Sequence, residues 1–477
     1  MGYPPPAMPP DWTTWPYHRP GSALRFPRDE GWHQLLPAGF ANPSLDEMEW
    51  VYLNAHLVEQ GGAGRRFVVF AAYFTQHLRF LVVRAFDAAD TPLGVHTGTA
   101  WGPLIASPDA LDLTFTHGGG SDTWRTRKDG AGRLVPFESH LSAVDDARTF
   151  RVELDLASTK APYDAGGVGA MPFGRQGSFF YYSLTRLRVE GTLHLPRADG
   201  TTEDVAVRGM GWYDHQWGNF YVTPFRGSRR EEYEWMSIQL DSGEEILLTT
   251  VWEPDGRTPS LPAYGGAGLV RADGSWDKLV GAQRWQRTEF WESPRQHGIY
   301  AAGWRFLAPE WGADLVITPR VTNQMTPIID AAPPGALGAV SRLMSGVFNY
   351  LGAFWEGSCR VTGTFAGAPV TGFAFAELIK RYERPQLFLE VMRDEPGLLV
   401  MRWRVTNPDD QVPLAHRWYV ERADGSVLAQ RDGVEVPVAV LDDPALPRNE
   451  PLIFRVVASS ADGTLSGSAA TPILLRA

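Results

Sequence analysis

VRGMGWYD, at residues 207–214, returns in altered form as VTGFAFAE at residues 370–377. Three shorter matches keep the same order along the chain: RVEGTL (188–193) with RVTGTF (360–365), FES (137–139) with WES (291–293), and EW (49–50) with EW (234–235). The spacing between partners changes only as loop insertions would change it. Ordered self-similarity of this kind indicates a repeated structural unit. We therefore predict two homologous domains, in which Glu377 is the counterpart of Asp214.

Short segments rich in β-branched and aromatic residues dominate both repeats. Examples are RRFVVFAAYF (65–74), LRFLVVRAF (78–86) and EEILLTTVW (244–252), and Gly, Asp, Asn or Pro separates such segments from their neighbours. This pattern is typical of antiparallel strands. The predicted fold class is all-β, with two tandem antiparallel β-barrels or deeply curved sheets at residues 35–217 and 218–384.

The two ends of the chain differ from the repeats. Residues 385–477 alternate apolar and polar residues between Asp-Gly turns, which suits a small immunoglobulin or fibronectin III-like β-sandwich. We assign this sandwich no catalytic role. Residues 1–34 begin with a proline-rich stretch and are expected to form an extended N-terminal arm.

Composition restricts the partners and the location. The 477 residues carry a formal net charge of -11 and no run of basic residues, so nucleic acid is not an expected partner. Cys359 is the single cysteine, which rules out an intrachain disulfide. The N-terminus does not look like a secretory signal, and the longest apolar runs are too short for a transmembrane segment. We expect a cytoplasmic protein and leave peripheral membrane contact open.

The ten residues GMGWYDHQWG (209–218) concentrate aromatic and polar side chains at the junction of the two predicted domains. Ligand sites favour domain interfaces, where aromatic walls surround a few polar groups. A hydrogen-bonded structural plug is the alternative interpretation. Asp214 favours a catalytic site over a structural plug. Its carboxyl, desolvated among Trp212, Tyr213 and Trp217, would have a raised pKa and could donate a proton.

Six motifs carry a resemblance to a known family. They are EWVYLNAHLVEQGG (49–62), YYSLTRLRVEGTL (181–193), VRGMGWYDHQWG (207–218), EYEWMSIQLDSGEEILL (232–248), FWEGSCRVTG (354–363) and FAELIKRY (375–382). In sequence and order they resemble the carotenoid 1,2-hydratase (hydroxyneurosporene synthase) and AttH-like family. The resemblance implies tandem lipocalin-like barrels and an enzyme that hydrates or cyclises hydrophobic polyenes. Related lipocalin-like enzymes include Diels–Alder cyclases.

A proton-donor mechanism is compatible with these residues. Asp214 would protonate an alkene, and His215 would orient Asp214 or hold the attacking water. The faces of Trp212, Trp217 or Trp355 would stabilise the resulting tertiary cation. The predicted catalytic residues are Asp214 and His215, and the predicted substrate-binding residues are Trp212, Tyr213, Gln216, Trp217, Tyr52, His56, Glu49, Tyr182, Trp355 and Glu356. Glu377 is a relic of the repeat or a second acid.

Three functions stay open from the sequence. The first is acid-assisted hydration or cyclisation of an isoprenoid or polyene, and the second is pericyclic cyclisation of a natural-product intermediate. The third is non-catalytic transport of a lipophilic compound. All three imply a hydrophobic small molecule as the partner. No cofactor is expected. No metal ion is expected either, because histidines such as His33 lack ligand-like spacing and only residues that converge in space could form a site.

Overall fold

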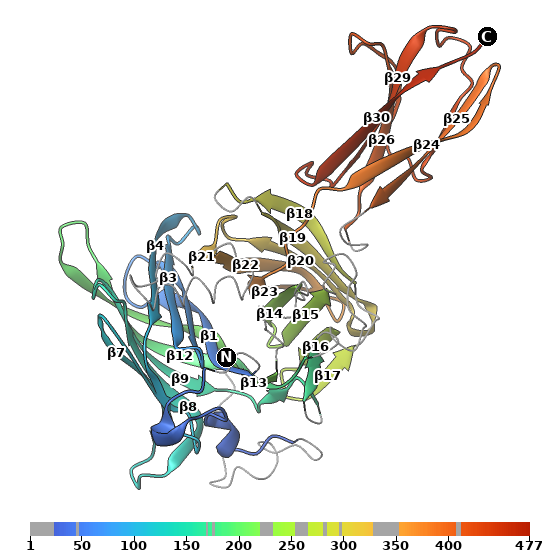
Figure 1. The fold of residues 1–477 in the computed structure, drawn as a ribbon. Coiled ribbons are helices and arrows are strands. Elements are labelled where there is room, and N and C mark those ends of the chain that lie inside the picture. The colour runs from blue at the N-terminus through green and yellow to red at the C-terminus, as the bar shows by residue number, and fades with distance from the viewer. Residues whose placement is uncertain are drawn as a thin grey trace.

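Strands form nearly all of the regular structure in this protein. The computed structural model describes residues 23–43, 47–167, 170–173, 177–219, 232–252, 266–279, 284–294, 298–327, 353–406 and 412–477. Figure 1 shows two curled sheets beside each other and a smaller unit that extends away from them. The predicted all-β class, with two tandem lipocalin-like half-barrels and an additional small β-unit, is confirmed. Among the residues described, no helix is long and apolar enough to cross a membrane.

The first half-barrel is a 13-stranded sheet. Its strands are β1 (Met48–Glu59), β2 (Arg66–Phe74), β3 (Leu78–Phe86), β4 (Pro92–Trp101), β5 (Leu104–Ala106), β6 (Asp112–His117), β7 (Gly120–Lys128), β8 (Leu134–Val144), β9 (Arg151–Ser158), β10 (Tyr163–Asp164), β11 (Met171–Phe173), β12 (Gly177–Pro196) and β13 (Thr202–Asn219). Two short 3-10 helices, η1 (Arg28–Glu30) and η2 (Pro37–Gly39), precede it.

The second half-barrel is a 10-stranded sheet. Its strands are β14 (Glu232–Leu240), β15 (Glu245–Trp252), β16 (Gly266–Val270), β17 (Trp276–Leu279), β18 (Arg284–Glu292), β19 (Ile299–Ala308), β20 (Ala313–Pro319), β21 (Met325–Pro327), β22 (Ala353–Phe365) and β23 (Ala368–Leu378). The 3-10 helix η5 (Pro309–Trp311) joins β19 to β20.

The two half-barrels share one strand order. The first runs β4-β3-β2-β1-β13-β12-β9-β8-β7 before it continues to β6 and β5, and the second runs β17-β16-β15-β14-β23-β22-β20-β19-β18. In each, the first strand of the repeat pairs antiparallel with the last. This common topology agrees with the internal repeat in the sequence, because RVEGTL lies in β12 and RVTGTF in the corresponding β22.

The C-terminal unit consists of two small sheets. Their strands are β24 (Gln386–Glu395), β25 (Leu398–Thr406) and β28 (Val438–Leu441) in one, and β26 (Ala415–Glu421), β27 (Val427–Arg431), β29 (Pro451–Ser459) and β30 (Ser466–Leu474) in the other. They enclose an apolar core that contains Trp403 and Phe454. Val412 and Leu465 instead pack into the core of the second half-barrel, which joins the two units.

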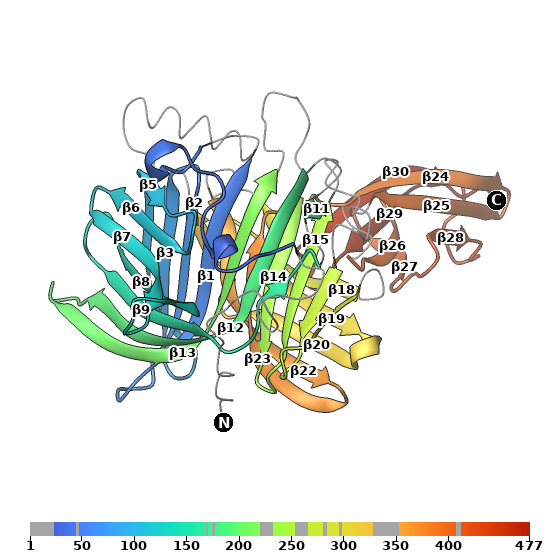
Figure 2. The same cartoon turned by 90° about the horizontal axis from the view of Figure 1, so that it is seen from below.

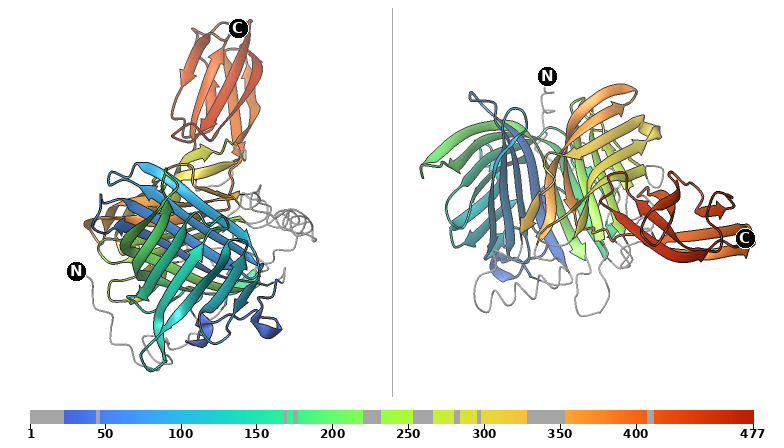
Figure 3. Two further views of the ribbon diagram at one scale, coloured as in Figure 1. Left: turned by 90° about the vertical axis from the view of Figure 1, so that its left-hand side faces the viewer. Right: turned by 90° about the horizontal axis from the view of Figure 1, so that it is seen from above.

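The two half-barrels pack against each other through β1, β13 and β12 on one side and β14, β23 and β22 on the other (Figures 2 and 3). Successive side chains of a strand point to opposite faces, so each of these strands serves two cores. One face fills the inside of its own half-barrel. The other face forms a third apolar core between them, which includes Tyr52, Trp212, Trp235 and Phe375. Side chains from both halves bond across this core, for example His56 to Ser358 Oγ at 2.8 Å.

The N-terminal segment is only partly described. Residues 1–22 of the expected arm lie outside the described part of the chain. Residues 23–34 contain η1 and contribute Leu24, Phe26 and Trp32 to the core of the first half-barrel, so this part of the segment packs on the sheet. Burial of these three apolar side chains removes them from water and fixes the segment against the sheet.

Candidate functional site

The motif GMGWYDHQWG lies in β13. One face of this strand points into the first half-barrel, and the other face points toward the second half-barrel. Tyr213 and Trp217 belong to the core inside the first half-barrel, and His215 shares their face. Trp212 belongs to the core between the half-barrels, and Asp214 bonds to its indole on that face. The motif therefore supplies two separate polar sites.

Three residues of the first half-barrel form a row across β1, β13 and β12 at the interface between the halves. Asp214 lies directly opposite Tyr52 on one neighbouring strand and Ser183 on the other. The second half-barrel presents a corresponding row across β14, β23 and β22, in which Glu377 lies opposite Trp235 and Glu356. Glu377 is thus the structural counterpart of Asp214, as the repeat predicts.

The two rows contact each other. The Tyr52 hydroxyl donates to Glu356 Oε2 at 3.4 Å, and its ring centroid lies 5.5 Å from that of Trp235. Trp235 donates through Nε1 to the Tyr181 hydroxyl at 2.9 Å. Asp214 and Glu356 are 2% exposed, and Glu377 is partly exposed. Carboxyls from both half-barrels therefore meet in one aromatic, largely dry cluster.

Burial controls the protonation of Asp214. Its Oδ1 accepts from Ser183 Oγ at 2.6 Å and from Trp212 Nε1 at 2.7 Å. Burial raises the pKa of Asp214 to about 7, although these two donors and Tyr181 oppose the rise, and the nearby Glu377 adds to it. Because two donors already occupy Oδ1, the proton of the neutral acid belongs on Oδ2. Asp214 is therefore a carboxylic acid that is protonated just below neutral pH.

The carboxyls of the second row are shifted in the same direction. Burial raises the pKa of Glu377 to about 7, against the bond donated by the Tyr233 hydroxyl. Burial also raises the pKa of Glu356 well above its usual value, and the charge of Glu377 adds to this rise. The cluster can therefore hold several protons at neutral pH.

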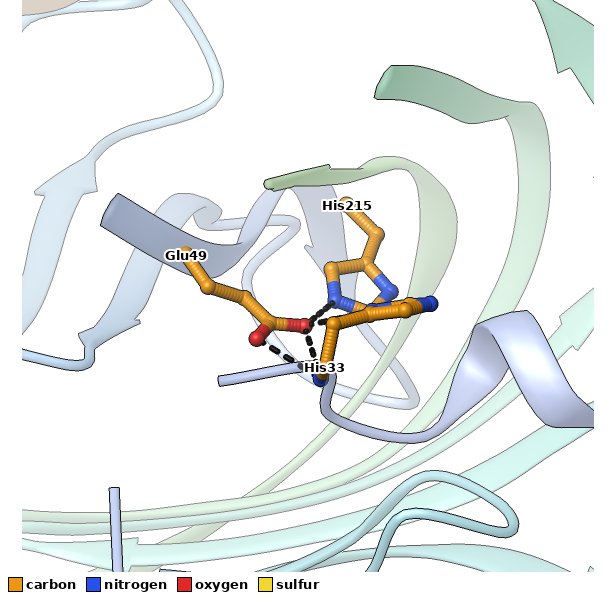
Figure 4. Close-up of side chains that lie close together, drawn as sticks. All are labelled: His33, Glu49 and His215. Carbon is orange, nitrogen blue, oxygen red and sulfur yellow. Dashed lines mark hydrogen bonds and ion pairs between the residues drawn. The ribbon is translucent and has the colours of Figure 1, made fainter. Parts of the chain in front are cut away.

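A second polar cluster lies inside the first half-barrel (Figure 4). Glu49 Oε1 is 2.9 Å from His33 Nδ1 and 2.9 Å from His215 Nε2. Burial would raise the pKa of Glu49, but the bonds from His215 and His33 outweigh it and lower the pKa to about 2. Glu49 is therefore an anion at neutral pH, unlike Asp214.

The structure separates the predicted site residues into three groups. Asp214, Trp212, Gln216, Tyr52, His56 and Glu356 lie on the strand faces between the half-barrels. His215, Tyr213, Trp217, Glu49 and Tyr182 face the inside of the first half-barrel, and Trp355 faces the inside of the second.

Three expectations are corrected by this separation. His215 does not orient Asp214, because adjacent residues of β13 point to opposite faces and His215 bonds to Glu49 and to the Asp29 carbonyl. Tyr213 and Trp217 do not desolvate Asp214, for the same reason. Trp217 and Trp355 are likewise in the wrong cores to face a cation at Asp214. The aromatic side chains near Asp214 instead include Tyr181 and Trp235, which were not predicted from the sequence.

The fold and the site together define a class: an all-β protein of two tandem lipocalin-like half-barrels with an acidic cluster between them. A family model described as AttH-like matches residues 106–381. This match covers more than half of the 477 residues, and the chain belongs to the AttH-like family.

The solved structures that are similar to this chain differ widely from it in sequence. A putative AttH from Nitrosomonas europaea is 20% identical, with 75% of this chain and 97% of that chain covered and a TM-score of 0.50, which shows a shared fold. Kievitone hydratase from Nectria haematococca is 16% identical, covers 75% and 93%, and has a TM-score of 0.49. CghA is 12% identical, covers 75% and 96%, and has a TM-score of 0.36. No curated protein sequence matches the chain.

Proposed function

We propose that this protein is an enzyme that adds a proton to a carbon–carbon double bond of an apolar small molecule, with Asp214 as the proton donor. The observation that carries the proposal is the meeting of Asp214, Glu356 and Glu377 in one cluster between two half-barrels, among aromatic side chains. The charge of Arg84 lowers the pKa of Glu356, but burial outweighs it, and the pKa values of all three carboxyls are raised. Buried carboxyls of this kind are costly unless they are protonated. Protonated carboxyls among aromatic rings suit acid chemistry on an apolar substrate.

The proposed reaction begins when Oδ2 of Asp214 transfers its proton to one alkene carbon, and the other carbon becomes a cation. Trp212 and Trp235 line the same core, with ring centroids 6.2 Å apart, and can face this cation. Each such contact is worth about 0.5 to 2 kcal/mol. Water or a second alkene of the substrate then forms the new bond to the cation. Attack by the second alkene leaves a new cation on that alkene, which loses a proton from a neighbouring carbon. The proton released from that carbon, or from the added water, restores neutral Asp214.

The proposal is tested by incubating the protein with linear isoprenoids and polyenes in heavy-oxygen water, and by following product masses. Wild-type protein is expected to give a labelled hydrate or an unlabelled cyclic isomer, and Asp214→Asn is expected to lose at least 100-fold in turnover. Asp204→Asn is the matched control, because Asp204 lies on the same strand, is exposed and bonds to His194. This control variant is expected to keep wild-type turnover.

Other outcomes of this experiment would favour pericyclic cyclisation or a carrier function. An isomer of unchanged mass that forms equally well with Asp214→Asn would contradict proton donation and favour pericyclic cyclisation, in which substrate folding supplies the rate. Tight binding without turnover would favour a carrier. Carotenoids are the substrates suggested by the resemblance to carotenoid 1,2-hydratase. The single buried Cys359 fits a reducing compartment, and our proposal places the enzyme in the cytoplasm.

A further inference from the structure

The cluster inside the first half-barrel brings together three groups that commonly bind metal ions. His33 Nδ1, His215 Nε2 and a carboxylate oxygen of Glu49 all lie within 4.8 Å of one another. Figure 4 shows the two imidazole rings and the carboxylate converging on one point. The three residues come from the segment after η1, from β1 and from β13, so their spacing in the sequence does not predict the cluster.

The two imidazoles face more hydrogen-bond acceptors than two neutral rings have N–H groups. His33 directs Nε2 to Asp29 Oδ1 at 3.0 Å, and His215 directs Nδ1 to the Asp29 carbonyl oxygen at 3.1 Å. Their other ring nitrogens both face Glu49 Oε1. All four ring nitrogens therefore face oxygens that accept, whereas a neutral imidazole donates only one N–H. Without an ion, the nitrogens that face Glu49 donate to its carboxylate. When the N–H groups are directed to Asp29 instead, two nitrogen lone pairs and a carboxylate oxygen are available to one cation.

We infer that His33, Glu49 and His215 bind a divalent transition-metal ion, for which Zn²⁺ is the best match. Two imidazole nitrogens and one carboxylate oxygen are a common ligand set for Zn²⁺ sites that keep a fourth position open. Tetrahedral bonds of about 2.0–2.1 Å separate ligand atoms by about 3.4 Å. To admit the ion, the two present 2.9 Å contacts of Glu49 need to open by about half an ångström, and the two imidazole nitrogens, which lie within 4.8 Å of each other, need to be about 3.4 Å apart.

The surrounding groups hold the three ligands in place. Asp29 receives the outer N–H of both histidines, which is the arrangement that fixes ligand histidines at metal sites. Glu49 Oε2 accepts from the backbone N–H of His33 and of Gln34, each at 2.8 Å, so that Oε1 is aimed at the imidazoles. Trp217 stacks on the His33 ring with centroids 3.9 Å apart.

Two tyrosines and a partly exposed edge adjoin the cluster. Tyr182 and Tyr213 have rings next to His215, and their buried hydroxyls interact with each other. Such hydroxyls can bond to water or to a small anion on the ion. The His33 side chain is 17% exposed, so an ion can reach the cluster from solvent. Asp214 faces away from it, and the inference is independent of the proposed reaction.

The decisive experiment is metal binding by the full-length protein after chelator treatment. Equilibrium dialysis against Zn²⁺ is expected to show one ion per chain, and Co²⁺ is expected to give the visible absorption bands of a four-coordinate site. A wild-type protein that retains no Zn²⁺ and gives only the spectrum of hydrated Co²⁺ would overturn the inference, and this readout needs no variant.

Variants locate the ion. His215→Gln and Glu49→Gln are expected to remove the Co²⁺ bands. Asp29→Asn is expected to weaken binding about 10- to 100-fold, because it replaces the carboxylate that accepts from His33 Nε2, while the backbone carbonyl that faces His215 is retained. His140→Gln is the matched control, since His140 lies on the surface between Asp155 and Glu153 and supplies a single imidazole. Unchanged binding by His215→Gln, or its loss in His140→Gln, would contradict the assignment. Thermal unfolding of each metal-free variant checks that it is folded.

Discussion

Replacement of Asp214 by Asn is expected to change the pH dependence of folding stability in a defined direction. Burial raises the pKa of Asp214 from 3.8 to about 7 in the folded protein. Between these two values the folded state binds more protons than the unfolded state, so the wild-type protein loses stability as pH rises through this window. Asn does not ionise and can still accept the bonds from Ser183 and Trp212 at its side-chain oxygen.

The magnitude follows from the shift. One pKa unit corresponds to about 1.4 kcal/mol, so ionisation of Asp214 destabilises the folded state by about 4.3 kcal/mol at pH 8 but by only about 1.7 kcal/mol at pH 5. The free energy of unfolding of Asp214→Asn, relative to wild type, should therefore rise by about 3 kcal/mol from pH 5 to pH 8. The new amide N–H₂ adds a constant cost of about 1–3 kcal/mol if it finds no partner.

Urea unfolding followed by tryptophan fluorescence at the two pH values measures this difference. Asp204→Asn, on the exposed part of the same strand, is the control and should show no comparable change. A difference between Asp214→Asn and wild type that is the same at pH 5 and pH 8, or that falls with pH, would refute the reasoning. Asp214 would then be a carboxylate that its donors stabilise.

Three further changes test neighbouring parts of the account. Glu377→Gln removes a negative charge that raises the pKa values of Asp214 and Glu356, so the alkaline limb of the pH–rate profile should move to lower pH. Tyr52→Phe removes the hydroxyl that donates to Glu356 and should lower turnover about 10-fold or more while the unfolding midpoint changes little, as measured by kinetics and calorimetry. Glu30→Gln removes a buried carboxyl whose pKa rises to about 8, and should cancel a loss of about 4 kcal/mol that wild-type stability suffers between pH 5 and pH 9 in urea titrations.

The fold could be predicted from the sequence to a large extent. The repeated motifs at 188–193 and 360–365 occupy corresponding strands of two sheets with one topology, and the β-rich pattern between them became the strands themselves. The assignment of residues to the three cores was harder to predict from the sequence. Alternation along β13 is enough to separate Asp214 from His215, but which face meets a second half-barrel depends on how two complete sheets pack.

Only part of the candidate site could be predicted, because the rest depends on how the strands pair and how the sheets pack. Asp214 and Glu356 were identified from their motifs, and the repeat pointed to Glu377. The register that sets Glu377 opposite both Glu356 and Trp235 exists only once the strands are paired. The cluster of His33 with Glu49 joins a segment outside the strands to the sheet, and no local pattern signals a contact of that kind.

The protonation state of Asp214 is the central claim and can be observed directly. The infrared difference spectrum of wild type minus Asp214→Asn, recorded at pH 6, should contain the C=O stretch of a protonated carboxyl. That band should disappear as pH is raised above 8, because the pKa of Asp214 is about 7. A difference spectrum that shows only carboxylate bands at pH 6 would contradict the account, since an ionised Asp214 has no proton to give.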